Sequence, residues 1–175
     1  MKSLVSDACV LQIAPPDKLI WNGQGYTCAL GKGGIQPNKR EGDGATPAGR
    51  FALRRLFYRS DRLPAPETAL PVQALTPKDG WCDDPAHEAY NQFITRPFSA
   101  SHEGLWRDDH VYDLIVQVGY NDDPIRAGNG SAIFMHIARP DYDATEGCIA
   151  LSRDHLLEIL RGCGPEAALT IPTSP

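Results

Sequence analysis

The sequence predicts one mainly β domain with one or two helices, an α+β class, and three observations support this. The chain has 175 residues, which suits one domain with a substantial core. Its 16 glycines and 15 prolines divide it into short segments, which favours many short strands. One segment, 152–164, has clear helix signals. With no internal repeat or low-complexity tract, residues 1–175 are interpreted as a single domain.

Short apolar runs between turn residues predict the strands of the first half of the chain. Residues 10–13 and 19–21 form a hairpin around Pro15-Pro16-Asp17, and a third strand covers 26–30. Residues 51–58 predict another strand. The stretch 63–77 contains four prolines and is expected to be an extended loop.

In the second half, residues 112–118 are apolar and rich in β-branched side chains, which predicts a buried strand, and 131–138 predicts another. Ser152 is suited to cap a helix that ends at Gly162 or Gly164. The apolar stripe of that helix consists of Leu156, Leu157, Ile159 and Leu160. Residues 168–171 are expected to form a closing strand.

Composition and charge narrow the class of protein. The formal net charge of −5 argues against nucleic acid as the main partner, because phosphate binding favours a basic surface. No run reaches the roughly 18 apolar residues of a membrane span. The first residues lack the apolar stretch of a secretory signal, which leaves either a cytoplasmic location or an export signal outside this sequence. The cysteine count of five is odd, and most are expected to be reduced, buried thiols.

The exception is Cys148, which follows Gly147 and lies twelve positions after His136. A thiolate is a strong nucleophile, and a neighbouring imidazole can hold or take its proton. Such pairing is expected to lower the thiol pKa from about 8.5 to about 6, increasing the thiolate on the order of 30-fold. The backbone amides of Cys148 and Ile149 are expected to face a developing oxyanion. The alternative is a structural cysteine beside a hydrogen-bonded core histidine.

Two separated stretches resemble the L,D-transpeptidase family, which has a YkuD-type catalytic domain. One is a strand that ends in His136, followed by a loop and Thr145-Glu146-Gly147-Cys148-Ile149. The other is Gly42-Asp43-Gly44-Ala45-Thr46-Pro47-Ala48-Gly49-Arg50-Phe51, similar to the family's Gly-Asp-x-x-Thr-Pro-x-Gly-x-Phe. The resemblance is strongest over residues 32–171. It implies a YkuD-like sandwich or barrel-type β fold.

The resemblance also implies a function: cross-linking of peptidoglycan stem peptides through an acyl-thioester, without a cofactor. Cys148 would be the nucleophile and His136 the general base, while the Gly147 carbonyl would accept a hydrogen bond from the histidine ring. Thr145 would brace the motif or contact substrate. The family implies a periplasmic or cell-wall location and reaction with carbapenems. Three differences from the common pattern concern specificity: a short loop after His136, Glu146 in place of histidine, and Ala150.

Further polar residues are candidates for substrate binding. Arg139 has the planar fork that clamps a carboxylate, or else it is a solvated loop residue. Tyr120 and Asn121 follow a predicted strand and are expected to line the cleft, although asparagine is also a common turn residue.

No metal site is expected. The segment 81–87 contains Cys82 and His87, with His102 and His110 further along the chain, but the spacing fits no zinc pattern. The segment is interpreted as a surface loop or cleft wall. The glycine-rich segment 31–34 lacks the Gly-Lys-Ser/Thr ending of a phosphate loop and is interpreted as a flexible turn.

Two alternatives to transpeptidation stay open. The same thioester delivered to water would make the protein an L,D-carboxypeptidase or amide hydrolase. A non-catalytic wall-binding module would keep the fold but have no need of a reactive thiol.

Overall fold

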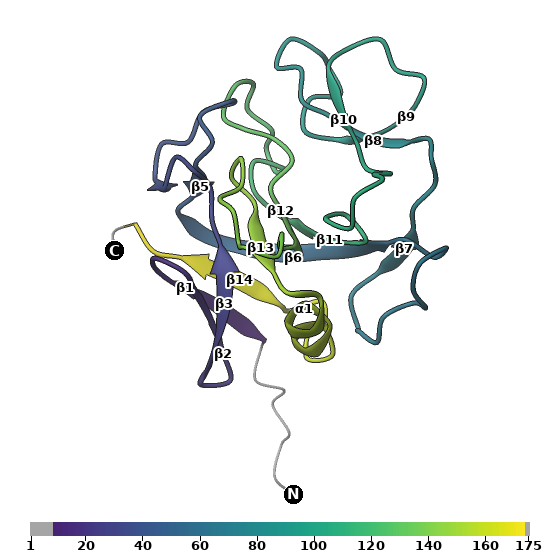
Figure 1. Ribbon diagram of the computed structural model, residues 1–175. Coiled ribbons are helices and arrows are strands. Elements are labelled where there is room, and N and C mark those ends of the chain that lie inside the picture. The colour runs from purple at the N-terminus through teal and green to yellow at the C-terminus, as the bar shows by residue number, and fades with distance from the viewer. Residues whose placement is uncertain (1–8, 174–175) are drawn as a thin grey trace, which may run out of the picture.

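The computed structural model describes residues 9–173, which form fourteen strands and one helix (Figure 1). The elements are β1 (Val10–Ala14), β2 (Lys18–Trp21), β3 (Gln24–Ala29), β4 (Ile35–Gln36), β5 (Thr46–Pro47), β6 (Gly49–Tyr58), β7 (Val72–Ala74), β8 (Asp79–Cys82), β9 (Phe93–Thr95), β10 (His102–Gly104), β11 (Leu114–Val118), β12 (Phe134–Ile137), β13 (Ile149–Leu151), α1 (Arg153–Leu160) and β14 (Ala168–Ile171).

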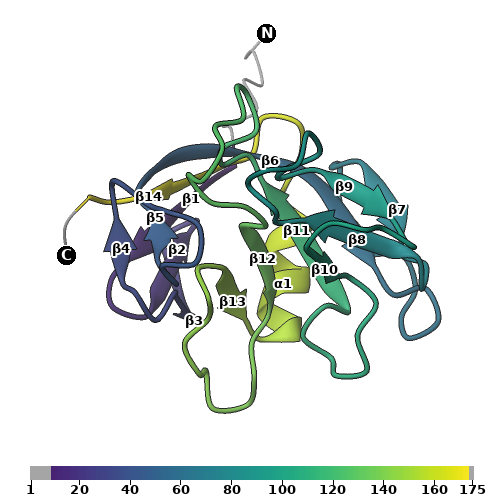
Figure 2. The ribbon, with the colours of Figure 1, turned by 90° about the horizontal axis from the view of Figure 1, so that it is seen from above.

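Nine of these strands form one sheet that closes on itself. Its order is β11-β12-β13-β3-β2-β1-β14-β6-β7, and β11 also pairs with β6. The ten-residue β6 makes this closure possible because it is long enough to have several partners. Its first residues pair with β14, and its last residues pair with β11 and β7. Figure 2 shows β6 curving across the assembly to join its two halves.

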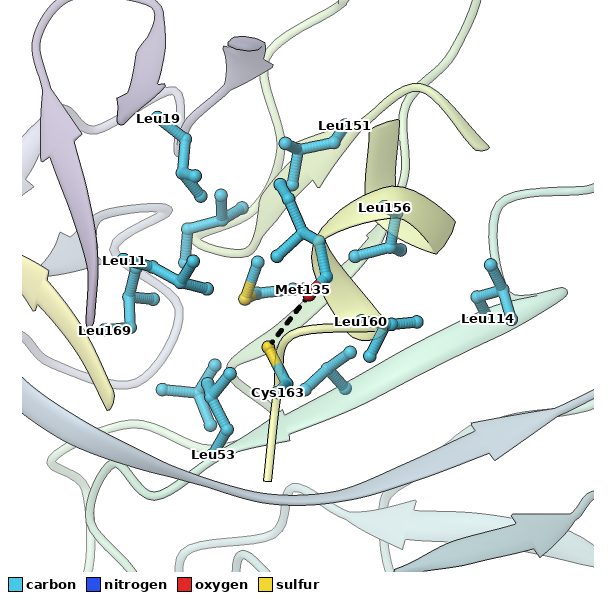
Figure 3. Packing of buried hydrophobic residues seen from close by; sticks show 14 of the residues in the cluster. Leu11, Leu19, Leu53, Leu114, Met135, Leu151, Leu156, Leu160, Cys163 and Leu169 are labelled. Carbon is cyan, nitrogen blue, oxygen red and sulfur yellow. Dashed lines mark hydrogen bonds between the residues drawn. The ribbon is translucent and has the colours of Figure 1, made fainter. Parts of the chain in front are cut away.

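The principal core is enclosed by this sheet and the helix. Ser152 caps α1 by accepting a hydrogen bond from the His155 backbone amide at 3.3 Å. Buried residues on one side of the helix then pack among leucines from the strands (Figure 3). Cys163 lies in the same core, where its thiol donates to the Ile159 carbonyl at 3.4 Å.

A second, three-stranded sheet has the order β10-β8-β9; it stands above β11 in Figure 1 and overlaps it in Figure 2. A second apolar cluster, which contains Phe57, Trp81, Tyr112, Phe134 and Cys148, packs residues of this sheet against β11 and β12. Cys148 therefore belongs to the cluster that joins the small sheet to the large one.

The predicted class is correct: the protein is mainly β with one helix. The helix and the predicted strands of the large sheet are present, most of them within two residues of their expected bounds, but the strand expected over 131–138 covers only Phe134–Ile137. Two predictions were wrong. The segment 63–77 is not only loop, because β7 pairs with β6 inside it. Residues 81 and 82 are not a surface loop, because Trp81 and Cys82 are buried in β8. In residues 9–173 no helix is long and apolar enough to cross a membrane.

Candidate active site

The register of β12 and β13 brings the two expected catalytic residues together. These strands are parallel, and His136 lies opposite Ala150. Side chains two positions apart along an extended strand point to the same face, so Cys148 shares a face with Ala150 and thus with His136. The backbone amide of Phe134, two residues before His136, donates to the Cys148 sulfur at 3.4 Å. Cys148 and His136, twelve residues apart in the sequence, are therefore neighbours on adjacent strands.

This face opens into a cleft of about 600 Å³. Cys148 and His136 both line it, although they are only 8% and 7% exposed. The small sheet and the segment after it also line the cleft, through His102, Glu103 and Arg107. The thiol is therefore buried among protein atoms and still borders the cleft.

The Cys148 thiol is neutral in this environment. Burial raises its pKa to about 12, and the negative charge of Glu103 adds to the shift. The sulfur donates to the Ala132 carbonyl at 3.3 Å. No hydrogen bond joins the sulfur and the His136 ring, two side chains that the structure describes. The expectation of an imidazole-paired thiol with a pKa near 6 was therefore wrong, because desolvation in the second apolar cluster dominates.

His136 is neutral as well. Burial lowers its pKa to about 4. Its Nδ1 lies 3.0 Å from the Ile137 carbonyl oxygen, which can only accept, so Nδ1 carries the proton. The other ring nitrogen, Nε2, then has a free lone pair and is able to take a proton. The predicted bond from this ring to the Gly147 carbonyl was wrong, because Ile137 takes the ring N–H instead.

The Gly147 carbonyl is instead bound by Thr46. The Thr46 hydroxyl donates to this carbonyl at 3.0 Å and accepts from the Gly31 amide at 2.8 Å. Three segments meet here, and neither glycine has room for a Cβ. A Cβ on Gly147 would lie 2.6 Å from the Ala45 carbonyl oxygen, and its φ of +136° is unfavourable for other residues. Through this hydrogen bond the segment 42–51 supports the cysteine motif, although the two are far apart in the sequence.

Thr145 acts as a local brace, one of its two expected roles. Its hydroxyl donates to the Cys148 carbonyl at 2.6 Å and accepts from the Gly147 amide at 3.1 Å. Together with Thr46, it fixes the backbone on both sides of the nucleophile candidate. Thr145 also lines the cleft, and its contact with substrate remains a prediction.

We expect Thr46→Val to destabilise the protein by roughly 2–4 kcal/mol, because the buried Gly31 amide and Gly147 carbonyl lose their partner. The loop carrying Cys148 should loosen, so that acylation of this thiol slows even in the folded fraction. Urea denaturation and the rate of Cys148 labelling measure the two effects.

Thr68→Val is the matched control for this prediction. The Thr68 hydroxyl also makes two backbone hydrogen bonds, to Cys163 and from Leu70, but it is not part of the cleft. It should cost stability without changing the labelling rate of Cys148. Equal labelling in the two variants would show that the Thr46 clamp does not position the thiol.

Among the expected substrate residues, Arg139 lines the cleft, and its guanidinium lies 3.9 Å from Asp109. Its role as a carboxylate clamp remains a prediction. Tyr120 and Asn121 do not line the cleft, so that prediction was wrong. The Tyr120 hydroxyl donates to the Asn129 carbonyl, and the Asn121 amide holds a turn through Arg126 and Gly130. Tyr120 and Asn121 therefore stabilise the turn that follows β11.

Sequence reasoning missed other groups that line the cleft, chiefly Glu103 and Tyr112, which are hydrogen-bonded to each other, and Glu41. Glu41 accepts from Ser131 at 2.7 Å and from Tyr90. Glu103 and Glu41 come from segments far apart in the sequence, and no motif marked them. The segment 81–87 does contribute one residue, Asp83, to the cleft wall. Within residues 9–173 no three His, Cys, Asp or Glu side chains gather in a way that could hold a metal ion.

Comparison with known proteins places this geometry in context. Residues 10–168 match the family model described as the L,D-transpeptidase catalytic domain. No curated protein matches the chain. Two similar solved structures are Mycobacterium tuberculosis L,D-transpeptidase 1 and the LD transpeptidase LdtMt1 in complex with imipenem. The match to the first has 15% sequence identity and a TM-score of 0.44, and it includes 95% of this chain and 60% of that protein's chain. The match to the second has 12% sequence identity and a TM-score of 0.43, and it includes 94% of this chain and 58% of that protein's chain. This chain thus spans about three fifths of either protein.

Proposed function

Because the chain belongs to the L,D-transpeptidase catalytic domain family, we propose that it cross-links peptidoglycan stem peptides through an acyl-thioester on Cys148. The observation that carries this proposal is the placement of Cys148 and His136 on one strand face, bordering one cleft. A purely structural cysteine and histidine have no need to border a cleft together. Because the proposed substrate is peptidoglycan, the reaction would take place at the cell wall.

The first step acylates the thiol. The Cys148 sulfur attacks the carbonyl that precedes the terminal D-amino acid of a donor stem, while Nε2 of His136 takes the thiol proton. A C–S bond forms, and the C–N bond to the D-amino acid breaks. The imidazolium returns the proton to the leaving amine. The amides of Cys148 and Ile149 are expected to stabilise the oxyanion of the tetrahedral intermediate.

The second step transfers the acyl group. An amine of an acceptor stem attacks the thioester, a C–N bond forms, the C–S bond breaks, and the thiol regains its proton. Because both catalytic groups rest in neutral form, the proton moves during attack rather than before it. Substrate binding also replaces water in the cleft, which strengthens the electrostatic interactions around the reacting atoms.

Incubation of the purified protein with muropeptides, followed by mass spectrometry of the products, tests the proposal. Cross-linked dimers are the expected product. Shortened monomers alone would support the L,D-carboxypeptidase instead. If no product forms and a carbapenem leaves the mass of the protein unchanged, the wall-binding module is the better explanation.

The probe experiment needs one precaution. A hydrogen bond with Cys163 lowers the pKa of the half-buried Cys9 thiol to about 7, so general thiol reagents should also label Cys9. A Cys9→Ser background removes this second site without touching the cleft.

A further inference from the structure

Glu103 lines the same cleft as Cys148 but belongs to the small sheet. It lies in β10, which pairs with β8, whereas Cys148 directly precedes β13 of the large sheet. One carboxylate oxygen, Oε1, accepts a hydrogen bond from the Tyr112 hydroxyl at 2.6 Å. Among residues 9–173 the carboxylate has no second hydrogen bond and no ion pair within 4.0 Å. Its other oxygen is therefore available to a ligand in the cleft.

Tyr112 links this carboxylate to the catalytic face. The tyrosine is buried, and its ring packs edge-on against the His136 ring, with 5.4 Å between centroids. Its hydroxyl holds Glu103 at the same time. The carboxylate is thus fixed relative to the groups that make and break bonds.

The cations that border the cleft have other partners. The Lys39 ammonium pairs with Asp43 at 2.7 Å, and the Arg107 guanidinium makes two hydrogen bonds to Asp109. The third cation, the Arg139 guanidinium, lies 3.9 Å from the same Asp109 carboxylate. Burial raises the pKa of Glu103, and the charges of Asp83 and Glu41 add to this, whereas the hydrogen bond from Tyr112 and the charge of Arg107 oppose it. A cation bound beside Glu103 would offset the negative charges of Asp83 and Glu41 and favour the ionised form of this carboxyl group.

The position of Glu103 is unfavourable for acylation. Its negative charge adds to burial in raising the pKa of the Cys148 thiol, which disfavours the thiolate. The second step brings in a primary amine, which is protonated and positively charged at neutral pH until it reacts.

We infer that Glu103 is the residue that selects the acyl acceptor, by binding the ammonium form of its attacking primary amine through the free carboxylate oxygen. This inference rests on the proposed function. The bound ammonium gives its proton to the neutral His136, the freed amine attacks the thioester carbon, and the C–S bond breaks. His136 releases this first proton to solvent. The attacking nitrogen then loses a second proton, which His136 passes to the departing sulfur, so that thioester and ammonium become amide, thiol and one released proton. Selective binding of the ammonium favours transfer to amines over hydrolysis.

The test measures the two steps separately in Glu103→Gln. Glutamine keeps an acceptor for the Tyr112 hydroxyl, so the fold should be retained, and thermal unfolding checks this. A donor stem tetrapeptide is used, and the burst of D-alanine release reports acylation. Transfer is then compared between D-methionine, which has a charged amine, and hydroxylamine, which is uncharged at neutral pH. Glu88→Gln is the control: it removes the same charge from an exposed position between β8 and β9.

Glu103→Gln should leave the acylation rate unchanged or increase it, and reduce transfer to D-methionine by tenfold or more. Transfer to hydroxylamine should stay within twofold of the wild type, and hydrolysis should gain a larger share of the products. Slower acylation, or equal loss with both acceptors, would overturn the inference, as would no change at all. If the wild-type protein releases no D-alanine and forms no acyl-enzyme, the proposed function itself fails, and the inference with it.

Discussion

Cys148→Ser is expected to reduce acylation by a donor stem on the order of 10³-fold or more, because the hydroxyl is a far weaker nucleophile than the thiol. The fold should survive, since serine keeps a donor for the Ala132 carbonyl. Release of the terminal D-amino acid, measured per folded molecule, provides the rate.

Cys28→Ser is the matched control. Cys28 is also buried, and burial likewise raises its pKa to about 12, but it packs in the principal core on β3, away from the cleft. The variant should lose stability and keep its acylation rate. If Cys148→Ser kept the wild-type rate, Cys148 would not be the nucleophile.

The second large effect is expected for His136→Asn, which removes the base. Acylation should fall by about 10²- to 10⁴-fold. The remaining activity should rise steadily with pH, because the thiol, with a pKa raised to about 12, must then ionise without help. His110→Asn, an exposed histidine that pairs with Asp113 outside the cleft, should leave the rate unchanged.

The pH profile of the wild-type protein distinguishes a neutral pair from an ion pair. His136 loses its function when it is protonated, so acylation should fall only as the pH drops toward its pKa of about 4. Above about pH 5 the rate should reach a plateau that extends past pH 9, since the thiol keeps its proton there. Measurement of acylation from pH 4 to pH 10 shows the plateau. A bell with limbs near pH 6 and pH 8.5 would indicate a preformed thiolate–imidazolium pair.

Local sequence predicted the parts of the fold that depend on local pattern. The alternating or continuous apolar runs gave most strands of the large sheet, and Ser152 with its following leucines gave α1. The small sheet was not predicted, because its strands have only three or four residues and are stabilised by burial against β11 and β12. That burial involves contacts between distant segments, which a single sequence does not show.

The same distinction applies to the site. Cys148 and His136 could be proposed from the sequence because each lies in a recognisable stretch, and the parallel register of β12 and β13 brings them to one face. The direction of the Cys148 pKa shift was wrong, because it depends on apolar residues from other segments. Thr46 was part of a recognised motif, but its bond to Gly147 spans 101 residues and has no local signal. Glu103 had neither a motif nor a local signal.

The central claim is that the sulfur at position 148 carries the acyl group between two peptides. Intact-mass spectrometry of the Cys9→Ser protein, quenched in acid soon after mixing with a donor stem, tests this directly. The account predicts a mass increase equal to the stem without its terminal D-amino acid, mapped to the peptide that contains Cys148 and absent in Cys148→Ser. Turnover of the stem with no adduct on Cys148, or with the adduct on another residue, would contradict it.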